Sequence, residues 1–334
     1  MVTANSISEN RKKRILYVDY LRGFGILLMV MGHVGFGRIF DQWIHAFHMP
    51  LFFFVSGYLF KKEEIVPRLK KRMKGLLIPY SLFGVAYCVF YFIRLERIDL
   101  HTLYLLCLEN TAELGIPYGG GLWFLTALLC ADTFYNCIRS RFENRNAYLL
   151  SALITVFGLA AAQFLPFRLP WGLDAGMVGV GFYAIGEYIF QHKERFLKIK
   201  GQFGLCGLLL FSGMTFLNGT VNMRTGQYNN CVLYVFNASG LTLSFFLLAY
   251  MLETIMNKCK DLYPLNWLKE VGENSIAYLC TNQIAIIITR HIVFHYSISN
   301  ILIQRIVVLL LVLLELTVFE RLVMKTMIRK LFGK

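Results

Sequence analysis

Long apolar runs separated by short polar segments dominate the pattern of this chain. A helix that crosses the hydrocarbon core of a bilayer needs roughly 20 mostly apolar residues, and about ten stretches approach or reach that length. They lie at residues 15–37, 44–60, 76–93, 122–138, 148–165, 175–190, 203–217, 231–256, 275–294 and 301–324. The pattern therefore predicts an all-α, polytopic integral membrane protein with about ten transmembrane helices.

The composition agrees with this prediction. Of the 334 residues, 57% are hydrophobic and 16% are charged, whereas a soluble domain typically has about 45–50% apolar and about 25% charged residues. These values exclude a soluble domain, a disordered chain and a disulfide-stapled secreted module. The eight cysteines show no CxxC spacing, so we expect them to be small packing residues.

The net charge of +14 raises the question of nucleic-acid binding, but the positions of the charges answer it. Basic residues gather in alternate connections, at 11–14, 61–74, 139–145, 193–200, 258–269 and 321–334. Positively charged loops stay on the cytoplasmic side, so both termini are predicted to be cytoplasmic. We expect no nucleic-acid partner, a cytoplasmic stub at residues 1–14, and one transmembrane domain at residues 15–334 embedded in the lipid bilayer.

The first predicted span contains ionisable residues, which are costly in a membrane and mark candidate functional sites. Arg22 and His33 lie eleven residues apart, which is three helical turns plus about 20°, or about 16 Å along one face. Asp19 is three residues before Arg22 and can pair with it. The alternatives are a structural ion pair and a hydrogen-bonded packing histidine.

The second predicted span places another histidine near the first. His48 comes just before Pro50, and this proline is expected to bend the helix. The short connection from the first span puts His48 at a depth similar to that of His33. A histidine with a near-neutral pKa can accept a proton from a hydroxyl group. Two histidines without a third ligand make a weak metal site, so we expect no metal.

Several later polar or aromatic residues have two interpretations each. Trp123 follows a run of glycines and fits either a closely packed loop or an interfacial anchor. The carboxylates within predicted spans can orient a histidine or pair with arginine; they are Asp132, Glu187 and Glu315. Amides such as Asn282 more often hold helices together in lipid than bind a ligand.

These residues carry a family resemblance. The pattern Asp19-x-Leu-Arg22-Gly, followed by Gly32-His33, resembles the start of the acyltransferase family 3 membrane proteins. Similar blocks follow in the family's order at residues 47–58, 72–80, 122–125 and 272–275. The first two blocks look closest to the fucose 4-O-acetylase-like branch.

The resemblance implies a multi-pass O-acyltransferase of a bacterial inner membrane. Its members are expected to move an acyl group, usually acetyl, from cytoplasmic acetyl-CoA to a carbohydrate hydroxyl, here on a cell-envelope polysaccharide or its precursor. By this resemblance, His33 is the catalytic base, Arg22 held by Asp19 stabilises negative charge, and His48 assists. The implied substrate contacts are Ser56, Trp123, Lys71, Arg72, Lys74 and Asn282. The alternative is a membrane transporter for glycans or small molecules, which often shows two matching halves that are not evident here.

Overall fold

The computed structural model describes residues 15–108, 116–256, 263–295 and 300–324. Within these residues the chain is helical and forms no strand; only an isolated antiparallel bridge joins Asn222 and Gln227. The stub predicted at residues 1–14 lies outside the described residues. The longer helices, in chain order, are α1 (Leu16–Val34), α2 (Arg38–His45), α3 (His48–Tyr58), α4 (Ile65–Leu95), α5 (Leu100–Leu108), α6 (Trp123–Arg141), α7 (Asn144–Phe164), α8 (Leu173–Gln191), α10 (Gly201–Leu217), α11 (Cys231–Met256), α12 (Tyr263–Glu273), α13 (Ser275–His295) and α14 (Ile301–Met324).

Each apolar run predicted as a span falls on one of these helices, or on α2 and α3 together. Among the described residues, five helices are long and apolar enough to cross a membrane by themselves, namely α4, α7, α11, α13 and α14. The helix α10 is apolar but shorter. The count of ten spans and the cytoplasmic position of the termini remain predictions.

The second predicted span is divided differently from the expectation. A bend was expected at Pro50, but the chain breaks earlier, at Ala46 and Phe47, between α2 and α3. Pro50 lies in the first turn of α3. A proline is tolerated there because the backbone N–H that it lacks has no partner within the helix. Because the chain breaks before His48, this residue lies at the start of a new helix.

The basic segment 61–74 is also not simply a loop. The helix α4 begins at Ile65 and continues for 31 residues, so most of this segment is helical. Lysine, arginine and leucine favour helices, and the apolar run that follows extends the same helix. As a result, the basic side chains have fixed positions on helix faces instead of lying in a flexible connection.

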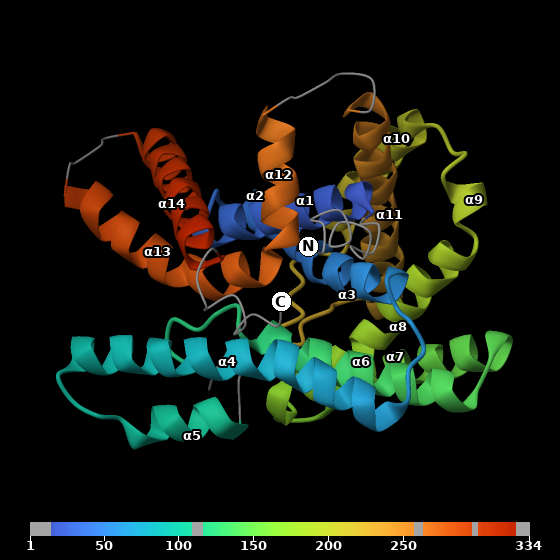
Figure 1. The fold of residues 1–334 in the computed structure, drawn as a ribbon, viewed down its shortest axis with the longest axis horizontal. Helices are drawn as coiled ribbons and strands as arrows, with labels where there is room; N and C mark the ends of the chain where they lie inside the picture. The colour runs from blue at the N-terminus through green and yellow to red at the C-terminus, as the bar shows by residue number, and fades with distance from the viewer. Residues whose placement is uncertain (1–14, 109–115, 257–262, 296–299, 325–334) are drawn as a thin grey trace, which may run out of the picture.

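The helices α1 and α8 make most of the contacts between different parts of the bundle. In Figure 1, α4, α6 and α7 lie along one edge of the molecule, while α13 with α14 and α10 with α11 form pairs on the other side. The helix α8 packs against α3, α6 and α7, and α1 packs against α3, α11, α12 and α13. The contact of α12 with α1 is close at Gly272, where any Cβ atom would overlap the carbonyl group of Asp19.

Candidate active site

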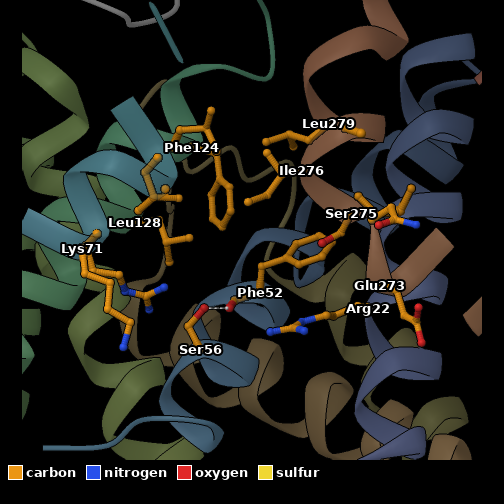
Figure 2. Close-up of a pocket in the computed structure, with 17 residues that line it drawn as sticks. Arg22, Phe52, Ser56, Lys71, Phe124, Leu128, Glu273, Ser275, Ile276 and Leu279 are labelled. Atoms are coloured by element: carbon orange, nitrogen blue, oxygen red, sulfur yellow. Dashed lines mark hydrogen bonds between the residues drawn. The ribbon is translucent and has the colours of Figure 1, made fainter. Parts of the chain in front are cut away.

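The structure contains a cavity of about 430 Å³ that we call the central cavity. Its walls come from α1, α3, α4, α6 and α13, which are far apart in sequence. Figure 2 shows Arg22 extending toward Ser56, with Lys71 on the opposite wall and Phe124 pointing into the space. Ser275, from the start of α13, closes the side next to α1. The cavity therefore joins the sequence blocks that carry the family resemblance.

A second cavity, of about 630 Å³, adjoins the first, and we call it the basic cavity. The two cavities share a set of polar lining residues, namely Arg22, Ser56, Lys71, Arg72 and Glu273. The basic cavity is also lined by Asp19, Lys61, Glu63 and Arg68. This concentration of guanidinium and ammonium groups favours a ligand with several negative charges.

Arg22 lies where the two cavities meet. Its Nη1 atom is 3.8 Å from Oδ1 of Asp19, one turn earlier on α1. The Asp19 side chain is buried, whereas the Arg22 side chain keeps 28% of its surface exposed. The pairing therefore leaves part of the guanidinium facing cavity space, as a residue that binds a ligand requires.

A buried network fixes the basic wall of the site. Asp132 of α6 accepts hydrogen bonds from Arg68 Nε at 2.7 Å, Arg68 Nη2 at 2.6 Å and Arg72 Nη2 at 2.7 Å. The hydroxyl of Tyr183 donates to the same carboxylate at 3.3 Å. From the sequence alone, Asp132 could either orient a histidine or pair with an arginine, and Arg68 was not among the predicted site residues. The available signal was the spacing of Arg68 and Arg72, which are four residues apart and share a helix face.

Glu63 balances part of the remaining charge. Lys71 Nζ donates to Glu63 Oε1 at 2.9 Å, and this hydrogen bond holds the pKa of the Glu63 carboxyl below its usual range. Glu63 lies in the short connection before α4. It is therefore ionised at neutral pH and orients the ammonium group of Lys71 along the cavity wall.

His33 lies at the opposite end of α1 from the two cavities. Its Nε2 atom is buried and has no hydrogen-bond partner among the described residues. Its backbone carbonyl accepts a hydrogen bond from Arg290 Nη2 at 3.2 Å. Among the described residues, the groups that act on its imidazole electrostatically are His45, Arg224 and Arg290, all of which are basic residues.

His48 interacts electrostatically with the imidazole of His33. His48 Nδ1 lies 2.7 Å from the carbonyl oxygen of Ile44, and its ring is 5.2 Å from that of His45. The histidines thus form a cluster around the break between α2 and α3. His48 is held by the backbone, whereas the buried nitrogen of His33 has no such contact.

The structure separates this histidine cluster from the cavities. His33 lines neither the central nor the basic cavity. Arg22, Ile26, Met29 and His33 follow one another at helical spacing on one face of α1. Ile26 lines the central cavity, and Met29 is buried between it and His33. Chemistry at His33 with a donor bound near Arg22 therefore requires a ligand that extends past Met29.

Three predicted substrate contacts lie away from both cavities. Lys74 is exposed on α4 and lines neither cavity, although it lies between the lining residues Arg72 and Gly75. Trp123 is buried beside Gly172, and its neighbour Phe124 faces the cavity instead. The amide of Asn282 donates to the carbonyls of Tyr278 and Leu279 within its own helix. No group of three or more histidine, cysteine, aspartate or glutamate side chains in the described part of the chain has an arrangement that fits a metal ion.

Comparison with known proteins gives one match. A family model described as an acyltransferase domain matches residues 15–319, which is most of the chain. No curated protein and no solved structure matches the chain. The match covers every helix that contributes to the two cavities and to the histidine cluster. It supports acyl transfer and gives no support to the transporter alternative.

Proposed function

Because the chain belongs to acyltransferase family 3, we propose that it is an integral-membrane O-acetyltransferase that uses acetyl-CoA and acts on a sugar hydroxyl. The acceptor is a surface polysaccharide or its precursor, and the membrane is a bacterial inner membrane. Within the family, the fucose 4-O-acetylase-like branch fits the first two sequence blocks best. The observation that carries the proposal is the position of Arg22 where the central and basic cavities adjoin, three turns before His33 on one helix face.

The donor binds on the basic side. Acetyl-CoA carries several phosphate charges, and Arg22, Lys71 and Arg72 line the space in which such charges would be neutralised. Charge-assisted hydrogen bonds from guanidinium to phosphate are roughly twice as strong as neutral ones. The positive-inside rule assigns this end of the molecule to the cytoplasm, where acetyl-CoA is available.

The acceptor arrives from the other side, where His33 and His48 lie. The buried Nε2 atom of His33 accepts the proton of the sugar hydroxyl, and the hydroxyl oxygen attacks the thioester carbonyl carbon. A C–O bond forms and the C–S bond breaks. The CoA thiolate leaves and takes the proton from His33, so that the products are the sugar acetate and free CoA thiol. Arg22 stabilises negative charge on the donor.

The decisive test compares acetyl transfer in matched histidine variants. The full chain is purified in detergent, supplied with acetyl-CoA and surface glycan from a strain lacking the gene, and assayed for CoA thiol release and alkali-labile acetyl esters. Removal of a general base typically lowers the rate about 10²–10⁴-fold, and we expect this loss for His33→Ala. His101→Ala is the control, because His101 is exposed on α5, away from both cavities.

Two results would overturn the proposal. A His33→Ala variant that acetylates glycan at the parent rate removes the assigned base. The second result combines two measurements. If the parent chain does not consume acetyl-CoA, and the surface glycan carries the same acetyl esters with and without the gene, the protein does not catalyse the assigned reaction.

A further inference from the structure

The basic residues on the predicted outer side are all arginines. Every lysine of the chain falls in a segment assigned to the cytoplasm, whereas the outer connections and helix ends carry only Arg38, Arg94, Arg97, Arg168, Arg224, Arg290 and Arg305. Basic residues are disfavoured on this side of a membrane protein. Arginine differs from lysine in its planar fork, which binds carboxylate and phosphate groups with two hydrogen bonds. Retention of arginine alone therefore suggests recognition of an anion.

Two of these arginines, Arg290 and Arg305, lie beside the end of α1 that carries His33 and the glycines that follow it. Arg290 Nη2 donates to the carbonyl of His33 at 3.2 Å and to that of Val34 at 2.8 Å. Arg305, from the start of α14, interacts electrostatically with Arg290. Both side chains are half-buried. The backbone of His33 is thus held by a guanidinium that has a second guanidinium as its neighbour.

The glycines that follow α1 leave space beside these side chains. Gly35 and Gly37 both have positive φ angles, of 76° and 104°, a conformation that glycine adopts readily. Among the described residues, a Cβ atom on Gly35 would have one non-neighbouring atom within 4 Å, Arg290 Nη2 at 3.8 Å. Within the same part of the chain, a Cβ atom on Gly37 would meet Arg305 Nη1 alone, also at 3.8 Å. Both guanidinium groups therefore lie beside the same stretch of backbone, at two positions that carry no side chain.

No carboxylate compensates this pair of charges in the described part of the chain. Neither Arg290 nor Arg305 forms an ion pair there within 4.0 Å. Asp41, in the first turn of α2, is the nearest acidic residue in sequence to Gly37, and it pairs with neither of them. Like charges repel each other, and an anion bound by both guanidinium groups beside Gly35 and Gly37 would relieve this repulsion.

We propose that Arg290 and Arg305 form an anion subsite that holds a carboxylate or phosphate group on the sugar acceptor. The inference rests on the proposed function and narrows its acceptor to acidic sugars, such as hexuronic acids or sugar phosphates. Arg290 is anchored on the carbonyl of His33, so an anion bound by it has a fixed position relative to the imidazole. A hydroxyl on the same sugar is thereby presented to the catalytic base.

The test measures sugar binding independently of catalysis. The full chain is placed in nanodiscs of phosphatidylcholine and titrated with methyl glucuronide, glucose 1-phosphate and methyl glucoside, which supply a carboxylate, a phosphate and a neutral control. We expect the two anionic probes to bind at least about tenfold more tightly than methyl glucoside, because hydrogen bonds to charged groups contribute more than hydrogen bonds between neutral groups. Arg305→Gln should remove this preference, and Arg305→Lys should restore part of it.

Arg94→Gln is the matched control, since Arg94 is an exposed arginine of the same predicted side at the end of α4. It should keep the full preference for anionic probes. Equal binding of all three sugars to the parent chain would overturn the inference, and so would an anionic preference that survives in Arg305→Gln.

A separate arm distinguishes a lipid headgroup from an acceptor. In this arm the nanodiscs contain phosphatidylglycerol. If these nanodiscs stabilise the parent chain but not Arg305→Gln, and the parent chain shows no preference among the three sugars, then the site binds lipid and the acceptor assignment is overturned. Acetyl transfer is measured on the same samples. A chain that transfers acetyl without preferring acidic sugars refutes this inference alone, whereas a chain that binds acidic sugars through Arg305 but never consumes acetyl-CoA refutes the proposed function.

Discussion

Asp132→Asn tests whether the buried network holds the basic wall of the site. The substitution preserves the size of the side chain and removes its charge. In the folded protein, Asp132 is 1% exposed and accepts three hydrogen bonds of 2.6–2.7 Å from Arg68 and Arg72. An asparagine can accept at one oxygen only, so at least one of these hydrogen bonds is lost, and both guanidinium groups lose the negative charge that compensates them.

The expected magnitude follows from the burial of Arg68. Breaking a buried ion pair by removing one partner typically costs about 3–5 kcal/mol. Arg68 is 6% exposed, but it also donates to the carbonyl of Lys61 at 2.6 Å and lies over the ring of Phe60 at 4.4 Å. These contacts remain in the variant, so we expect a loss at the lower end of the range, about 3 kcal/mol.

The assay is reversible unfolding of the full chain in mixed micelles, followed by intrinsic fluorescence, with acetyl-CoA turnover measured in parallel. Glu143→Gln is the control, because its pair with Lys62 is 3.7 Å long and exposed, and such pairs contribute only about 0–1 kcal/mol. Combining Asp132→Asn with Arg68→Gln should recover part of the loss, because the uncompensated buried charge is then absent. If Asp132→Asn is no more destabilising than Glu143→Gln, the network does not hold the wall.

Three further outcomes test the site. Arg22→Gln should raise the KM for acetyl-CoA at least tenfold, since hydrogen bonds to charged groups contribute about 1.5–3 kcal/mol each. An unchanged KM would mean that the ion pair between Arg22 and Asp19 has only a structural role. Lys71→Gln should also raise this KM, whereas Lys74→Gln, outside both cavities, should not; equal effects in a steady-state titration would contradict the assignment of the donor site. Gly272→Val should impair folding, because its side chain would overlap the carbonyl of Asp19; normal yield and thermal stability of this variant would show that α12 does not pack on α1 as described.

Much of the helical architecture is predictable from the sequence because apolar runs report burial in lipid or protein directly. Each predicted run falls on one helix, except the run at residues 44–60, which is divided between α2 and α3. Helical spacing also places Arg22 and His33 on one face of α1. The break before His48 was missed because a proline is visible in sequence, whereas an irregular Ala46–Phe47 junction has no comparable local signal.

Local sequence patterns specify which segments are helical and that Asp19, Arg22 and His33 share one helix face, and they predict on which side of the membrane the charges lie. These properties depend on the spacing of residues along a helix and on the transfer of side chains between water and lipid. Both depend on residues that are close together in the sequence. Only the tertiary structure decided that Asp132 pairs with Arg68 and Arg72, that Lys71 faces the cavities while Lys74 does not, and that Arg290 reaches the end of α1. These contacts join residues distant in the chain, and packing of several helices at once selects each partner.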